Sequence, residues 1–171
     1  MMEQGWLLAL TGQASDAASL MASGITLLRS TGTTYWLPTF LSYLAMAYAE
    51  LSQFDDAWCR LSEAMTAIER TGETWFEADV YRIAGEVALQ GPQTDAAKAE
   101  AYFKHALAVA REQQAKSWEL RAAMSLARLW RSQGKVQQAR DLLAPVYGWF
   151  TEGFDTRDLK EAKALLEESR S

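Results

Sequence analysis

The chain has 171 residues, 49% of them apolar and 23% charged, which is the composition of an ordinary globular domain and excludes a disordered or fibrous chain. Seventeen basic and twenty-two acidic residues give a net charge of −5, which argues against nucleic acid as a partner held by charge. The single cysteine, Cys59, excludes an internal disulfide and suits a reducing cytoplasm, and no apolar run approaches the roughly 20 residues that span a membrane.

Helical periodicity predicts nine helices and no strands. Prolines are scarce, and no stretch alternates apolar and polar residues as a half-buried strand does. The predicted helices span residues 2–11, 14–30, 35–52, 54–71, 75–90, 94–114, 118–133, 136–151 and 156–169. Short linkers join them, so neighbouring helices must run antiparallel.

Small residues recur every 40 to 42 positions, which indicates stacked helix pairs. One series is Gly5, Ala45, Gly85 and Ala127, and a second is Ala17, Ala57, Ala99 and Ala139. Helices that cross closely need a small residue where their backbones approach and a large one beside it, such as Phe103 or Leu143. One pair cannot bury its apolar face alone, so the pairs must stack into an α-solenoid.

The ends of the helices carry their own signals. Gly32 and Gly72 follow "RST" and "ERT", where a helix ends in the left-handed conformation. The first helices of three pairs begin with a tryptophan, at Trp36, Trp75 and Trp118. A Ser or Thr lies just before each of them, and we expect its hydroxyl to cap the helix. These expected caps are Thr34, Thr74 and Ser117. Core packing explains most of the aromatic content, and a ligand pocket is the alternative.

These patterns predict one all-α domain of about four antiparallel helix pairs with a C-terminal capping helix. The expected repeats are about 1–33, 34–73, 74–116 and 117–154, and the capping helix spans 155–169. Asp155 is expected to cap this last helix while Phe154 packs on Leu159.

The residues at repeat-equivalent sites resemble tetratricopeptide repeats (TPR). The resemblance lies in the small residue of each first helix, an aromatic residue soon after it (Tyr48, Trp130), and the alanine and bulky residue of each second helix (Leu61, Phe103, Leu143). The steps of 40 to 42 residues look like the longer-helix variety in bacterial signalling ATPases and transcription activators, such as the maltose-operon activator.

Residues 72–168 resemble the C-terminal end of multidomain bacterial proteins in which a class III adenylate/guanylate cyclase domain precedes a predicted ATPase domain and a repeat array. This resemblance implies a cytoplasmic signalling protein of bacterial type. The first repeat is short, since only residues 1–4 precede Gly5, so we expect the chain to be the tail or a fragment of a longer protein.

The residues needed for catalysis are missing from the sequence. His105 is the only histidine, there is no GxxxxGK[ST] phosphate loop, and no stretch supplies the paired aspartates of a cyclase. We expect His105 in a packing or surface role and Cys59 as a small buried residue. The sequence therefore predicts no enzyme activity, no cofactor and no metal site. It favours a non-catalytic protein-interaction scaffold, and the alternative is a sensor that binds a small metabolite in its concave groove.

The first helices are expected to line that groove, where a protein, a peptide or an upstream domain of the same parent chain would bind. The candidate partner-binding residues are Arg82, Glu86, Arg121, Met124, Arg128 and Arg131, with Trp6, Ser42, Met46 and Asp79 on the same side. Arg121, Arg128 and Arg131 share one helix face, and guanidinium groups suit carboxylate or phosphate. The alternative is that Asp79 and Glu86 on the neighbouring helix pair with these arginines.

The N-terminal segment predicts self-association. Trp6, Leu7 and Leu10 lie on a helix too short to cover its own apolar face. An exposed apolar patch of this kind is typical of an interface, so we expect a homodimer through the first helix pair.

Overall fold

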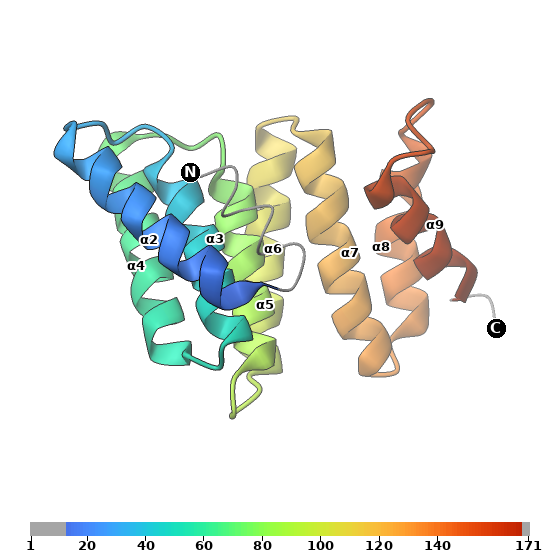
Figure 1. Cartoon of the computed structure of the whole chain (residues 1–171). Coiled ribbons are helices and arrows are strands. Elements are labelled where there is room, and N and C mark those ends of the chain that lie inside the picture. The colour runs from blue at the N-terminus through green and yellow to red at the C-terminus, as the bar shows by residue number, and fades with distance from the viewer. Residues whose placement is uncertain (1–12, 169–171) are drawn as a thin grey trace.

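The computed structural model describes residues 13–168, and all the regular structure in this range is helical (Figure 1). Its eight helices are α2 (Ala14–Ser30), α3 (Leu37–Glu50), α4 (Phe54–Thr71), α5 (Glu77–Gln90), α6 (Ala96–Glu112), α7 (Lys116–Ser132), α8 (Val136–Gly148) and α9 (Arg157–Glu168). The predicted all-α solenoid is confirmed. The predicted helix at 2–11, with Gly5, Trp6, Leu7 and Leu10, lies outside the described residues.

The helices form consecutive antiparallel pairs, α3 with α4, α5 with α6 and α7 with α8 (Figure 1). The first helices α3, α5, α7 and α9 pack against one another in succession. Within the described range the second helices α2, α4, α6 and α8 pack mainly against first helices, and side-chain contacts such as Lys98 with Trp58 also join neighbouring second helices. The first helices therefore line the inner side of the array, where neighbouring pairs come closest.

The repeating small residues lie where the helices of a pair cross. Across the described residues both series are fully buried, at Ala45, Gly85 and Ala127 and at Ala17, Ala57, Ala99 and Ala139. A Cβ atom on Gly85 would lie 2.3 Å from the Phe103 ring, far inside van der Waals contact. Phe103 itself has no exposed surface. The predicted pairing of a small residue with a large one is thus confirmed in the third pair.

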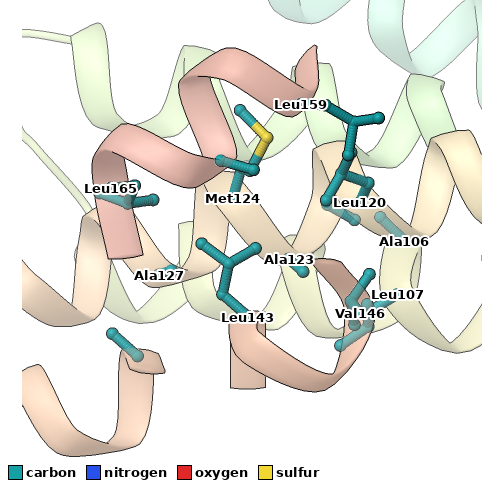
Figure 2. Close-up of a cluster of buried hydrophobic side chains, with 13 residues drawn as sticks. Ala106, Leu107, Leu120, Ala123, Met124, Ala127, Leu143, Val146, Leu159 and Leu165 are labelled. Atoms are coloured by element: carbon teal, nitrogen blue, oxygen red, sulfur yellow. The ribbon is translucent and has the colours of Figure 1, made fainter. Parts of the chain in front are cut away.

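The C-terminal core joins α6, α7, α8 and α9, as Figure 2 shows. Leu143 of α8 is buried there, as predicted, and Leu159 and Leu165 of α9 close the core from the other side. The final helix is therefore packed as a first helix of a further, incomplete pair, and it covers apolar surface that α7 and α8 would otherwise expose.

The expected glycine stops are confirmed, but the expected side-chain caps are wrong. Gly32 and Gly72 adopt left-handed φ angles of 74° and 71°. The residues that precede α3, α5 and α7 are Trp36, Phe76 and Ala115, and none of them makes a side-chain capping bond.

Backbone carbonyls serve in place of the hydroxyl caps at two of these helices. The Thr34 carbonyl accepts from the Leu37 amide (3.1 Å), and the Thr74 carbonyl accepts from the Glu77 amide (2.9 Å). Ser117 lies inside α7 and caps nothing.

The last helix begins later than expected. It starts at Arg157, and the residue before it is Thr156, whose hydroxyl donates to the Gly153 carbonyl (2.7 Å). Phe154 is nearly half exposed and contacts Tyr147 (ring centroids 5.9 Å apart). Gly153 in the left-handed conformation turns the chain at this point and sets the later start.

Phe103→Ala should destabilise the domain by about 3–5 kcal/mol, because it removes a fully buried ring and leaves a cavity beside Gly85. Urea unfolding followed by circular dichroism measures the change. A loss under about 1 kcal/mol would contradict the packing of the third pair.

Candidate binding surface on the inner helices

The inner face is built from side chains that α3, α5 and α7 direct away from the second helices. We call five of them the polar row: Tyr43, Asp79, Arg82, Glu86 and Ser125. They join α3 to α5 and α5 to α7, and Asp79 and Ser125 are buried. Polar groups buried between helices must satisfy one another, so this row fixes the spacing of the inner helices as well as their chemistry.

The centre of the polar row is the pair formed by Asp79 and Arg82. Arg82 Nε donates to Asp79 Oδ1 (2.6 Å), and its guanidinium also approaches Glu86 (3.8 Å). Burial alone would lower the pKa of Arg82, but Asp79 and Glu86 raise it above its usual value. Tyr43 hydrogen-bonds the same aspartate, and burial together with the Asp79 charge raises the pKa of its phenol. This centre therefore holds a fixed charge pair and a neutral phenol.

Glu86 links the row to α7. Its Oε1 accepts a hydrogen bond from the Ser125 hydroxyl (2.6 Å). About a third of the Glu86 side chain remains exposed, so the carboxylate also faces the inner surface.

The three arginines of α7 pair with the last helix. Arg121 Nε lies 2.6 Å from Asp158, Arg128 Nη2 lies 2.8 Å from Glu161, and Arg131 Nη1 lies 2.8 Å from Glu168. The expected alternative, pairing with Asp79 and Glu86, is wrong, because those two acids are already engaged by Arg82 and Ser125. The arginine face does bind carboxylates, and in this structure the carboxylates come from α9.

A pocket of about 340 Å³ opens between α5, the α5–α6 turn and α7. Its apolar lining comes from Leu89, Ala96 and Leu129, and its polar lining from Glu86, Thr94, Ser125, Arg128, Ser132 and Gln133. Two of the predicted partner-binding residues, Glu86 and Arg128, thus meet at one pocket. Their opposite charges and the hydroxyl groups around them suit a polar side chain or a short peptide stretch.

Most of the predicted groove residues lie on the inner side of the array, but some of them are buried and not exposed there. Met124 is 3% exposed and packs with Leu159 and Leu165 of α9 (Figure 2), so it belongs to the core. Ser42 is also buried and donates to the Thr39 carbonyl. Met46 is half-buried. The acids of α9 were not predicted as part of this site, although the i, i+3 spacing of Asp158 and Glu161 marks them as one helix face.

The residues with potential for chemistry lie apart from one another. His105 is half exposed, and its ring lies 4.0 Å from that of Tyr81 at a tilt of 51°. It also approaches Glu77 (3.6 Å), and its exposure agrees with the predicted surface role. Cys59 is exposed, so its predicted burial is wrong. No group of three or more His, Cys, Asp or Glu residues within 13–168 could hold a metal ion. In the same range no helix has both the length and the apolarity to cross a membrane.

Comparison with known proteins identifies the fold. No protein-family model matches the chain, and no curated protein matches it. Solved structures do: a crystal structure of TPR-like repeats from a Podosopora anserina protein described as a kinesin light chain has a TM-score of 0.71 at 18% identity. It covers 98% of this chain and 82% of its own. A crystal structure of a substituted variant of those repeats has a TM-score of 0.68 at 18% identity, over 99% and 91% of the two chains. The chain therefore has a TPR-like helical repeat fold.

Acid should weaken the ion pairs that Glu161 of α9 makes. Arg157 and then Arg128 hold the pKa of Glu161 below its ordinary value of 4.5. The unfolded chain therefore binds more protons near and below pH 4.5, and the contribution of Glu161 is present above that pH and lost as pH falls through its lowered pKa.

Urea unfolding between pH 6 and pH 3 should show that the free energy of unfolding falls as the pH is lowered. This pH dependence should be weaker in Glu161→Gln. Burial alone would raise the pKa of Glu119, but Lys116 and Arg111 lower it, so part of the slope must remain in this variant. An identical slope in both proteins would contradict the pairing of Glu161.

Proposed function

We propose that this chain is a non-catalytic protein-interaction scaffold whose inner face, formed by α3, α5 and α7, binds a segment of a protein partner. The observation that carries the proposal is the pocket of about 340 Å³ between α5 and α7, which lies beside the α7 arginines. A helical repeat array offers a rigid inner surface on which such a segment can lie extended across several pairs.

The chemistry of α9 supports an acidic partner. Its carboxylates pair with the guanidinium groups of Arg121, Arg128 and Arg131, and this supports a carboxylate as the group that a partner would present here. Arg128 both lines the pocket and pairs with Glu161 at a largely exposed position. A partner carboxylate can therefore share or take this guanidinium while an adjacent side chain enters the pocket.

The alternative function is a small-molecule sensor, and the same pocket favours it. Its volume falls at the low end of the range for small-molecule sites. A metabolite with an apolar part against Leu89 and Leu129 and a polar end near Glu86 would fit this lining. A metabolite that raises the melting temperature of the chain, and fails to do so in a Leu129→Trp variant that fills the pocket, would favour the sensor over the scaffold.

The sequence supports two further proposals, on the parent chain and on self-association. The resemblance of residues 72–168 to cyclase–ATPase proteins suggests an upstream domain of the same parent chain as one partner, in a bacterial cytoplasm. We also propose, from the sequence alone, that the chain self-associates through Trp6, Leu7 and Leu10. The coding sequence upstream of Met1 tests the first proposal, and light scattering of the chain and of Trp6→Glu tests the second.

Two matched triple variants separate a binding role of the arginines from a structural one. Arg121→Ala, Arg128→Ala and Arg131→Ala together break the three ion pairs and remove the cations, whereas Asp158→Asn, Glu161→Gln and Glu168→Gln break the same pairs and leave the cations free. Because exposed ion pairs contribute about 0–1 kcal/mol each, both triples should unfold only slightly more easily than the parent.

Peptides selected on the unaltered chain from a displayed library of random twelve-residue sequences supply the binding readout. We expect acidic peptides to be enriched, to lose at least about tenfold in affinity for the alanine triple, and to bind the amide triple as well as or better than the parent. Equal losses in both triples would assign the arginines a structural role only, and enrichment of peptides without acidic residues would contradict the proposed partner chemistry.

A further inference from the structure

The helices α3, α5 and α7 begin at the same edge of the array (Figure 1). Five aromatic side chains form a continuous cluster there. This edge cluster consists of Tyr35, Trp36, Trp75, Phe76 and Trp118. Successive ring centroids lie 4.2 Å apart for Trp36 and Trp75, 4.4 Å for Trp75 and Phe76, and 4.9 Å for Phe76 and Trp118. Tyr35, Trp36 and Trp75 are 50%, 40% and 37% exposed. Core packing, expected from the sequence for most of these aromatics, therefore does not account for the outer three.

The three exposed rings lie against one another. Tyr35 and Trp75 are nearly parallel, at 21° with centroids 6.1 Å apart. Trp36 stands almost perpendicular to both, at 87° to Tyr35 and 90° to Trp75. The face of an aromatic ring carries the negative part of its quadrupole, so a ring face that stays exposed attracts a positive charge.

The backbone holds these rings in place at some conformational cost. Trp36 has a φ of 69°, in the left-handed region that a bulky side chain rarely occupies. Gln113, beyond the end of α6, donates through Nε2 to the Thr74 carbonyl (2.8 Å) and so fixes the loop that carries Trp75. Residues kept in unfavourable conformations by their surroundings are concentrated at functional positions.

One oxygen of a carboxylate in the same loop has no hydrogen-bond partner within residues 13–168. Glu73, two residues before Trp75, has its Oε2 atom buried with no hydrogen-bond partner among the described residues. A buried carboxylate oxygen without a partner is unfavourable, and a cation is the group that offsets this cost best. The edge therefore combines exposed rings with a nearby loop carboxylate, one oxygen of which is buried without a partner among the described residues.

The other tryptophans of the described range differ from Trp36 and Trp75 in having a cation over the ring. Each of them has a lysine or arginine of the chain over its ring: Lys98 at 3.8 Å from Trp58, Arg121 at 4.9 Å from Trp118, Lys116 at 5.6 Å from Trp149, and Lys104 at 5.9 Å from Trp130. Within residues 13–168, no lysine or arginine lies over the rings of Trp36 and Trp75. Tyr35 directly precedes Trp36 in the sequence, and Glu73 lies two residues before Trp75.

We propose that Tyr35, Trp36, Trp75 and Glu73 form a site for a cationic side chain, arginine or lysine, presented by a protein partner. The rings are open to solvent over a third to a half of their surface, which suits a side chain arriving from outside rather than an enclosed metabolite. The overall charge of −5 also favours a basic partner. The site lies on the edge of the array and does not depend on the inner-face function proposed above.

The direct test compares two short peptides that differ only in charge on the unaltered chain. The first is acetyl-Gly-Arg-Gly-Arg-Gly-amide, and the second replaces both arginines by citrulline, which is neutral and nearly the same shape. Indole N–H signals are followed by ¹H–¹⁵N NMR, with Trp36→Phe and Trp75→Phe used to assign them. The arginine peptide should shift the Trp36 and Trp75 signals, and the citrulline peptide should bind at least about fivefold more weakly. Equal shifts with both peptides, or none at about 20 mM, would overturn the proposal.

Two variants test whether the arginine peptide binds at the edge cluster. Glu73→Gln keeps the shape of the side chain and removes its charge, so it should weaken the arginine peptide at least about threefold without moving the citrulline response. Trp149→Phe is the matched control, because Trp149 is exposed at 57% but already lies near Lys116, and this change should leave binding unaltered. Binding that survives Glu73→Gln undiminished, or that is lost in Trp149→Phe, would contradict the assigned site.

Discussion

The closeness with which two helices cross within a pair governs the rest of this structure. At Gly85 the backbone of α5 approaches the Phe103 ring of α6 so closely that any side chain would meet three ring atoms within 2.9 Å. Buried alanines take the corresponding place in the neighbouring pairs, at Ala45 and Ala127. Because every pair crosses at a small residue, the pairs have similar shapes and stack at a regular spacing. That regularity presses the first helices together along one side and creates the inner face.

The same close stacking decides which polar groups can interact with a partner. Asp79 and Ser125 lie between successive first helices, so they bind neighbours within the chain. Arg121 and Arg128 stand further out and find their carboxylates on α9, whose apolar side completes the C-terminal core. The inner face thus combines a fixed polar row with exchangeable ion pairs at its rim. The edge cluster has a different origin, because it arises where the loops before the first helices bring aromatic residues of successive pairs together.

Much of the fold could be predicted from sequence because it depends on residue size repeated at a fixed period. Phe103 and Leu143 were identified as core residues from that period alone. Cys59 could also have been placed correctly, since it is two positions from buried Ala57 and so points away from the buried face of α4.

Other features were beyond sequence because they depend on three-dimensional orientation. The partners of Arg121 and Arg128 lie 37 and 33 residues further along the chain, and the direction of α9 selects them.

The central claim, that the size of residue 85 and the size of residue 103 are matched, is tested most directly by a double-mutant cycle of Gly85→Ala and Phe103→Leu in urea unfolding. Gly85→Ala should cost about 1–3 kcal/mol in the parent and at least about 1 kcal/mol less in the Phe103→Leu background. Additive effects, agreeing within about 0.5 kcal/mol, would contradict the account.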